Sequence, residues 1–201
     1  MPVTINGNGT ITGVSVGGLP DGIVDTDMLA ANAVSSAKLA SGAGGKLLQV
    51  VHVNSNTHQT STSTSFVDLS GISASITPSS SSNKILIMCN LAISKANDES
   101  FLGRVVRDGS AISGAGGVRM SGATSQEEGI WLNVRTTIYD ISPFTVIYLD
   151  SPSTTSAITY KAQGKTSGSA NGFSFNRTGS GSNQLYNSPS FSSITLMEVA
   201  A

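Results

Sequence analysis

At residues 42–53 the chain reads GAGGKLLQVVHV, and the change of texture inside this stretch decides the fold. Before Lys46 the sequence is rich in glycine and poor in large apolar side chains. From Leu47 onward, apolar residues recur with a period near two, and β-branched residues fill runs that are separated by turn-forming residues. We therefore divide the chain into a leader (residues 1–46) and a β-rich head domain (residues 47–201).

The head contains a series of short strand-like runs with no helical period between them. Such a series predicts an all-β fold, an antiparallel β-sandwich of the jelly-roll type. Asp108-Gly109 stands between two of the runs and predicts a tight type I′ turn, in which both central residues take positive φ. The predicted strands are Leu47–Val53, Ile72–Thr77, Ile85–Ile93, Phe101–Arg107, Trp131–Ile138, Phe144–Leu149, Ile158–Gln163, Phe173–Phe175 and Ile194–Val199.

One run, Ile85–Leu91, is apolar at almost every position rather than at alternate ones. In an antiparallel domain this pattern is explained if one side of the strand faces the core and the other side faces a neighbouring subunit. The run therefore predicts an oligomer.

The leader has too few apolar residues to bury a core of its own. Alternation over residues 3–16, interrupted at Asn6–Gly9, predicts a small hairpin. Thr26 can cap a short helix from Asp27 to about Leu39. A helix this short is marginal in water without packing, because isolated helices need roughly 12–15 residues or more. Its support must come from sister copies or from a larger assembly.

Composition excludes several classes of function. A net charge of −1 and a pI near 6.0 give no attraction for nucleic acid, and no stretch is long and apolar enough for membrane insertion. Cys89 is the only cysteine, so no intrachain disulfide can form. The hydroxyl-rich surface composition, without a signal peptide at Met1, is what we expect of a virion component that is assembled in the host cytoplasm.

The motifs that could carry chemistry are better explained by structure, so we expect no enzyme, no cofactor and no metal site. Gly164-Lys165-Thr166 resembles the end of a phosphate loop but lacks its upstream glycine. His52 and His58 have no neighbours that would complete a metal site, although a threefold axis would triple either one. Cys89 lies in an apolar run and is expected to be buried and inert.

Two further sets of residues are ambiguous or unconvincing as sites. Glu127 and Glu128 are adjacent, so in an extended chain they point to opposite faces and cannot act on one bond. Trp131 is expected in the core, with a sugar-stacking or interface role as the alternative. The tyrosines have the same ambiguity.

The leader resembles a known family. The stretch Met1–Gly13 (MPVTINGNGTITG), followed by Gly18–Gly22 (GLPDG) and Leu29–Ala40 (LAANAVSSAKLA), resembles the N-terminal and stem segments of tail-fibre proteins and related appendages of marine bacteriophages. The head, through Lys84–Ile87, Arg104–Gly109 and Ser193–Val199, is similar to trimeric jelly-roll heads of the complement and tumour-necrosis-factor type. Many fibres repeat the stem unit, whereas this chain has scarcely more than one.

The resemblance implies a short homotrimeric tail fibre that binds other virion proteins through its leader and a bacterial surface glycan or protein through its head. It does not indicate which residues bind the receptor. A capsid-decoration or head-fibre protein is the alternative, and a free lectin or glycan hydrolase is a third class. The candidate virion-attachment residues are Val3, Ile5, Ile11 and Val14, and the candidate trimer contacts of the stem are Leu29, Val34 and Leu39.

Overall fold

The computed structural model describes residues 4–5, 11–12, 34, 45–95, 100–112, 130–132, 140–168, 172–178 and 189–201. For β1, β2, Lys95 and residues 130–132 it describes the backbone alone. The chain divides into two compact units, Met1–Gly45 and Lys46–Ala201, close to the division expected from the sequence. The described residues contain no helix, and so none that could cross a membrane.

In the first unit, strand β1 (Thr4–Ile5) pairs antiparallel with β2 (Ile11–Thr12). Thr4 lies opposite Thr12, and Ile5 lies opposite Ile11, so the predicted hairpin around Asn6–Gly9 is confirmed. The predicted helix lies outside the described residues apart from Val34, which is half exposed.

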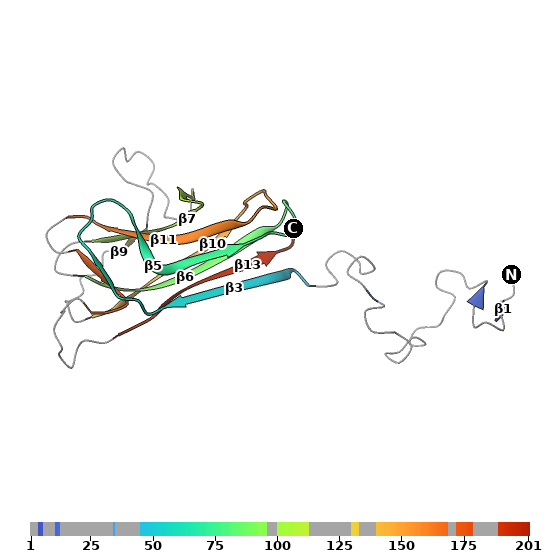
Figure 1. Ribbon diagram of the computed structural model, residues 1–201, viewed down its shortest axis with the longest axis horizontal. Coiled ribbons are helices and arrows are strands. Elements are labelled where there is room, and N and C mark those ends of the chain that lie inside the picture. The colour runs from blue at the N-terminus through green and yellow to red at the C-terminus, as the bar shows by residue number, and fades with distance from the viewer. Residues whose placement is uncertain are drawn as a thin grey trace. The chain divides into compact units, whose positions relative to one another are not determined.

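The second unit is a sandwich of two antiparallel sheets (Figure 1). Sheet I has the order β3-β13-β6-β12-β4, and β10 pairs with the other edge of β6. Its strands are β3 (Leu47–Ser55), β4 (Gln59–Ser61), β6 (Lys84–Lys95), β10 (Ser142–Asp150), β12 (Phe173–Phe175) and β13 (Ser192–Val199). Strand β4 was not predicted, because QTS carries no apolar residue.

Sheet II has the order β5-β11-β7-β8, with β9 also paired to β7. Its strands are β5 (Val67–Ile76), β7 (Phe101–Arg107), β8 (Ser110–Ala111), β9 (Ile130–Leu132) and β11 (Ile158–Thr166). Strand β5 begins earlier than predicted, and residues 133–138 of the predicted strand after Trp131 lie outside the described residues.

The long strands alternate between the sheets along the chain. Strands β3, β6, β10 and β13 belong to sheet I, whereas β5, β7 and β11, which follow them in turn, belong to sheet II. Neighbours within a sheet are therefore distant in sequence, as in a jelly roll. The turn between β7 and β8 is the predicted one, since Asp108 and Gly109 have φ values of 49° and 83°.

Aromatic rings from both sheets fill the core. Phe101 of sheet II makes edge-to-face contacts with Phe144 and Phe173 of sheet I, with ring centroids 5.5 and 5.0 Å apart. A Cβ atom on Gly164 would lie 2.5 Å from the Phe101 ring, so glycine is required there for packing. Gly164-Lys165-Thr166 thus belongs to strand β11 and not to a loop before a helix, where a phosphate loop would lie.

One end of the sandwich, which we call the stem end, brings together the start of β3 and the C-terminus (Figure 1). The Ala200 amide donates to the Lys46 carbonyl at 2.8 Å. The buried Glu198 carboxylate accepts from the Ser79 amide, the Ser79 hydroxyl and the Asn83 side chain at 2.6–2.7 Å. The opposite end, where β3 ends and β13 begins, is the distal end.

Candidate subunit interface

The outward side of sheet I carries a continuous set of apolar side chains, which we call the apolar face. The strand registers arrange them in rows across β3, β13, β6 and β10. Val50, Met197, Leu86 and Leu149 form one row, and Met88 and Ile147 lie in the next. The members of the apolar face are Leu47, Val50, Leu86, Met88, Ile147, Leu149, Met197 and Val199.

Several of these side chains are strongly exposed. Ile147 is 64% exposed and Val50 is 52% exposed, while Leu86 and Met197 are half-buried between their neighbours. Leu48, the extra residue of a β-bulge against Glu198 and Val199, is exposed as well. Soluble monomers rarely expose a contiguous apolar patch of more than a few hundred Å², so the apolar face has the character of a contact surface.

The apolar face has a polar border on its distal side. Asn54, Ser193, Asn90 and Thr145 form the next row along the strands, and the Thr145 hydroxyl donates to the Asn90 side-chain carbonyl at 3.0 Å. His52 sits between the two regions, where its Nδ1 shares a hydrogen bond of 2.8 Å with the Thr195 hydroxyl. The apolar face is therefore confined to the half of sheet I nearer the stem end.

Along the same strands, residues that face the core alternate with residues of the apolar face. Ile85, Ile87 and Cys89 of β6 are buried, and they alternate with Leu86 and Met88. Burial raises the pKa of the Cys89 thiol to about 12, so this cysteine is an inert core residue, as expected. The predicted two-sided apolar character of Ile85–Leu91 is confirmed, and the outward half is left without a partner within the described residues.

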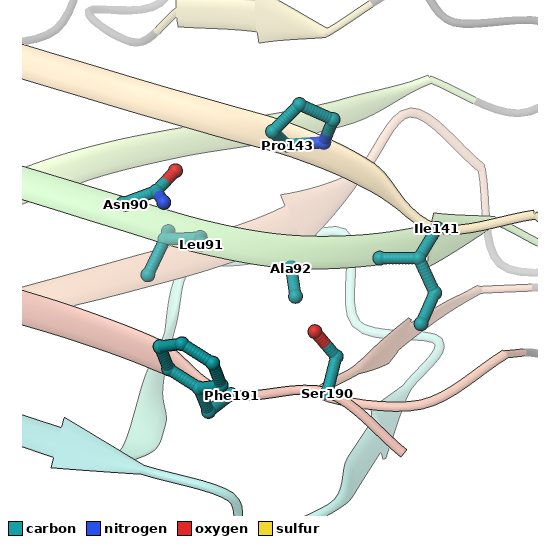
Figure 2. A pocket seen from close by; sticks show the side chains of 7 residues that line it. All are labelled: Asn90, Leu91, Ala92, Ile141, Pro143, Ser190 and Phe191. Atoms are coloured by element: carbon teal, nitrogen blue, oxygen red, sulfur yellow. The ribbon is translucent and has the colours of Figure 1, made fainter. Parts of the chain in front are cut away.

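A shallow groove lies beyond the polar border, and we call it the distal groove (Figure 2). Its volume is about 230 Å³, and it is open on one side. Figure 2 shows Phe191 and Ser190, just before β13, beside the β6 residues Leu91 and Ala92, with Pro143 and Ile141 on the β10 side. Its lining residues are Asn90, Leu91, Ala92, Ile141, Pro143, Ser190 and Phe191.

A polar cluster around Asp150 links the two sheets. Asp150 of sheet I accepts hydrogen bonds from the Tyr160 hydroxyl at 2.6 Å and from the Arg107 guanidinium at 2.7 Å, both from sheet II. Burial raises the pKa of Tyr160 far above its ordinary value, and the Asp150 carboxylate raises it further. The Tyr160 phenol therefore stays neutral and acts as a structural donor.

His58 contacts a buried serine. Its Nε2 lies 3.0 Å from the Ser174 hydroxyl, and Ser174 is only 3% exposed, so a substrate could not reach that oxygen. Burial and the nearby Arg177 charge lower the pKa of His58, which favours the neutral ring. Within the described residues, no group of three or more His, Cys, Asp or Glu side chains is placed to hold a metal ion.

Most residues singled out in the leader cannot be placed in a site. In the first unit the structure describes the backbone of Ile5 and Ile11 but not their side chains. Val34 is described as well. Val3, Val14, Leu29, Leu39, Glu127 and Glu128 lie outside the described residues, as do the side chains of Trp131, Tyr139 and Tyr186. The assignment of attachment and stem contacts to the leader therefore stays a prediction.

Sequence reasoning missed two parts of the surface. Ile147 and Leu149 were treated as strand residues of the sandwich, although their alternation with Phe144, Val146 and Tyr148 marks a strand that is apolar on both sides. Phe191 stands among serines and prolines, and no periodic signal distinguishes it. The position of these side chains on a shared surface depends on which strands become neighbours in the fold.

Comparisons with known proteins add no identification. No protein-family model matches the chain, and no curated protein matches its sequence.

Proposed function

We propose that the protein is a non-enzymatic structural component of a bacteriophage virion, a short homotrimeric tail fibre whose sandwich binds the host surface. The observation that carries the proposal is the apolar face of sheet I, which is exposed in a single chain and crosses the strands β3, β13, β6 and β10. Covering this face with a second copy removes apolar area from water at roughly 25 cal/mol per Å².

The position of the apolar face suits a cyclic assembly. Leu47 begins the face directly after Lys46, where the leader joins the second unit. If the symmetry axis runs along the sandwich, all leaders emerge at the stem end and all distal ends point the other way. A two-ended appendage needs this arrangement, with attachment at one end and recognition at the other.

The choice of three subunits rests on the resemblance of the chain to trimeric fibre heads, and the jelly-roll strand order supports it. In such a ring one surface of each subunit packs against a different surface of the next. The contact is therefore heterologous, and it closes after three copies. A stable contact of this kind buries more than about 1,000 Å² in total. Three identical distal ends can then gain roughly 10² to 10⁴ in avidity on a multivalent surface.

A capsid-decoration or head-fibre protein is the second candidate. It would use the same trimer and the same leader, with the leader bound to a capsid shell. The observation that keeps it open is the single stem unit in residues 23–43, because a short stem suits a protein that sits close to a shell.

The oligomeric state tests the proposal first. Light scattering should give the mass of a trimer for the full-length protein, and also for a chain that begins at Lys46, because the apolar face belongs to the sandwich. A monomer in both samples would reject the assembly.

Immunogold labelling of purified phage particles then locates the protein. Label at the tail supports the fibre, and label over the head selects the decoration protein. Excess purified protein should also block phage adsorption if the sandwich binds the receptor, and unchanged adsorption at saturating protein would argue against that role.

A further inference from the structure

We propose that the distal groove is a binding site for one neutral pyranose ring, the recognised unit of a cell-surface glycan. The biological role of this site rests on the proposed function, but the binding chemistry does not.

The groove begins at the polar border of Asn54, Ser193, Asn90 and Thr145, because Asn90 belongs to both, and it lies beyond the apolar face that forms the proposed subunit contact. Phe191 precedes β13, and Ala92 lies near the end of β6, so both lie at the distal end. In the proposed fibre the groove is therefore at the end that points away from the particle.

The lining combines an aromatic ring with neutral hydrogen-bonding groups. Phe191 is 69% exposed, the highest value among the large apolar side chains of the described residues. One face of a pyranose ring presents C–H groups, which stack on an aromatic ring such as Phe191. Figure 2 shows that Asn90 and Ser190, which carry a side-chain amide and a hydroxyl, line the same groove and offer hydrogen-bonding groups to a sugar.

The hydrogen bond of Asn90 leaves its donors available. Its side-chain carbonyl accepts from Thr145, and this contact fixes the amide orientation. The NH₂ group then presents two donors to a ligand. Asn90 is exposed, so these donors are solvated in the free protein and exchange water for a sugar hydroxyl on binding.

The lining also limits the charge and the size of the ligand. None of the lining residues is charged, so the groove offers no partner for a phosphate, a uronic acid or a sialic acid. Its volume of about 230 Å³ is below the roughly 300–1,000 Å³ of sites that enclose a drug-sized molecule. One ring fits, and the open side lets the rest of a glycan chain extend into solvent.

Saturation-transfer NMR on the full-length protein tests the site. The probes are glucose, galactose, mannose and N-acetylglucosamine, with glucuronic acid and N-acetylneuraminic acid as charged probes. We expect saturation of the C–H protons of at least one neutral sugar, with weak affinity near the millimolar range, and no stronger transfer to either acid.

Two variants assign the binding to the groove. Phe191→Ala should weaken binding on the order of tenfold, whereas Phe191→Tyr should retain it, because the tyrosine ring preserves stacking. Leu48→Ala is the matched control, since Leu48 is exposed and apolar but lies outside the groove. Loss of binding in Phe191→Ala with retention in Leu48→Ala supports the site.

Four results would overturn the site: no transfer to any of the neutral sugars, equal transfer in Phe191→Ala, stronger binding of an acid, or a loss of oligomer mass in Phe191→Ala without any sugar binding. The last result would make Phe191 a subunit contact. Light scattering on the same samples separates this proposal from the fibre. A monomer that binds sugar through Phe191 rejects the trimer alone, and a trimer that binds no neutral sugar rejects the groove alone.

Discussion

The outward sides of the two sheets differ sharply, although both sheets alternate and share one core. On sheet I the outward positions of β6 and β10 include Leu86, Met88, Ile147 and Leu149, with the polar residues Lys84, Asn90 and Thr145 at the two ends. On sheet II the outward positions of β5 and β11 hold hydroxyl, amide and charged groups, namely Asp68, Ser73, Ser75, Thr159, Lys161 and Gln163.

Polar side chains of sheet II form hydrogen bonds with one another. Asp68 accepts from Lys161 at 2.9 Å and from Gln163 at 2.7 Å, and Ser75 shares a hydrogen bond of 2.8 Å with Thr159. Sheet II is thus finished as a solvent-facing surface, and sheet I is not. The outward apolar residues of sheet I are not buried by the described residues, and this difference supports the proposed subunit contact.

The largest expected effect comes from placing a charge on each outward side in turn. Ile147→Glu would bury an unpaired carboxylate in a subunit contact, and we expect the trimer to dissociate with an affinity loss of about 100-fold or more. Ser73→Glu on sheet II, opposite Lys161, should leave the mass unchanged. Light scattering measures both. Dissociation by Ser73→Glu, or a trimer that tolerates Ile147→Glu, would reverse the assignment of the two sides.

The next effect separates folding stability from assembly. Asp150→Ala leaves the Tyr160 hydroxyl and the Arg107 guanidinium without their shared acceptor, and we expect it to lower the free energy of unfolding by about 3 kcal/mol. Asp68→Ala removes the ion pair with Lys161, in which both side chains are exposed, and should cost less than about 1 kcal/mol. Urea unfolding measures both changes, and equal costs would contradict the contrast between interior and surface.

A pH effect is expected at the stem end. Burial raises the pKa of Glu198, but the hydrogen bonds from Asn83 and Ser79 outweigh it, so the folded pKa lies below the ordinary value of 4.5. A lowered carboxyl pKa contributes stability above pH 4.5, and that contribution is lost as the pH falls through the folded pKa. Thermal unfolding of Glu198→Gln should therefore depend less on pH below 4.5 than that of the native protein. A variant with the same pH dependence as the native protein would show that this carboxylate is not the source.

The smallest expected effect lies at the rim of sheet II. The Arg104 guanidinium carbon lies 3.9 Å from the centre of the Phe66 ring. Phe66→Leu keeps an apolar side chain but removes the cation–π contact, and it should lower the free energy of unfolding by about 0.5–1 kcal/mol. The trimer should persist, because Phe66 lies outside the apolar face. A change of oligomer mass in this variant would place the subunit contact on sheet II and contradict the assignment to sheet I.

The sequence predicted the strands well where apolar residues were frequent. Ile85–Ile93 and Ile158–Gln163 fall inside observed strands, and in both the buried residues mostly occupy alternate positions. Gln59–Ser61 was missed, because its pairing with Phe173–Phe175 depends on the neighbouring strand and not on its own residues. The side-chain amide of the buried Asn176 donates to the Ser55 and Thr57 carbonyls, residues more than a hundred positions away, and no local pattern could predict these contacts.

The sequence by itself determined the fold class, the division near Lys46, the Asp108-Gly109 turn and the hairpin of the leader, because periodicity and turn chemistry are local properties. The tertiary structure decided which strands lie side by side. Through that pairing it gathered apolar residues from β3, β13, β6 and β10 on one outward side, and it placed Phe191 beside Asn90. Surfaces of this kind are made of residues far apart in the chain, so a local pattern such as Ile85–Leu91 reveals only one strand of them.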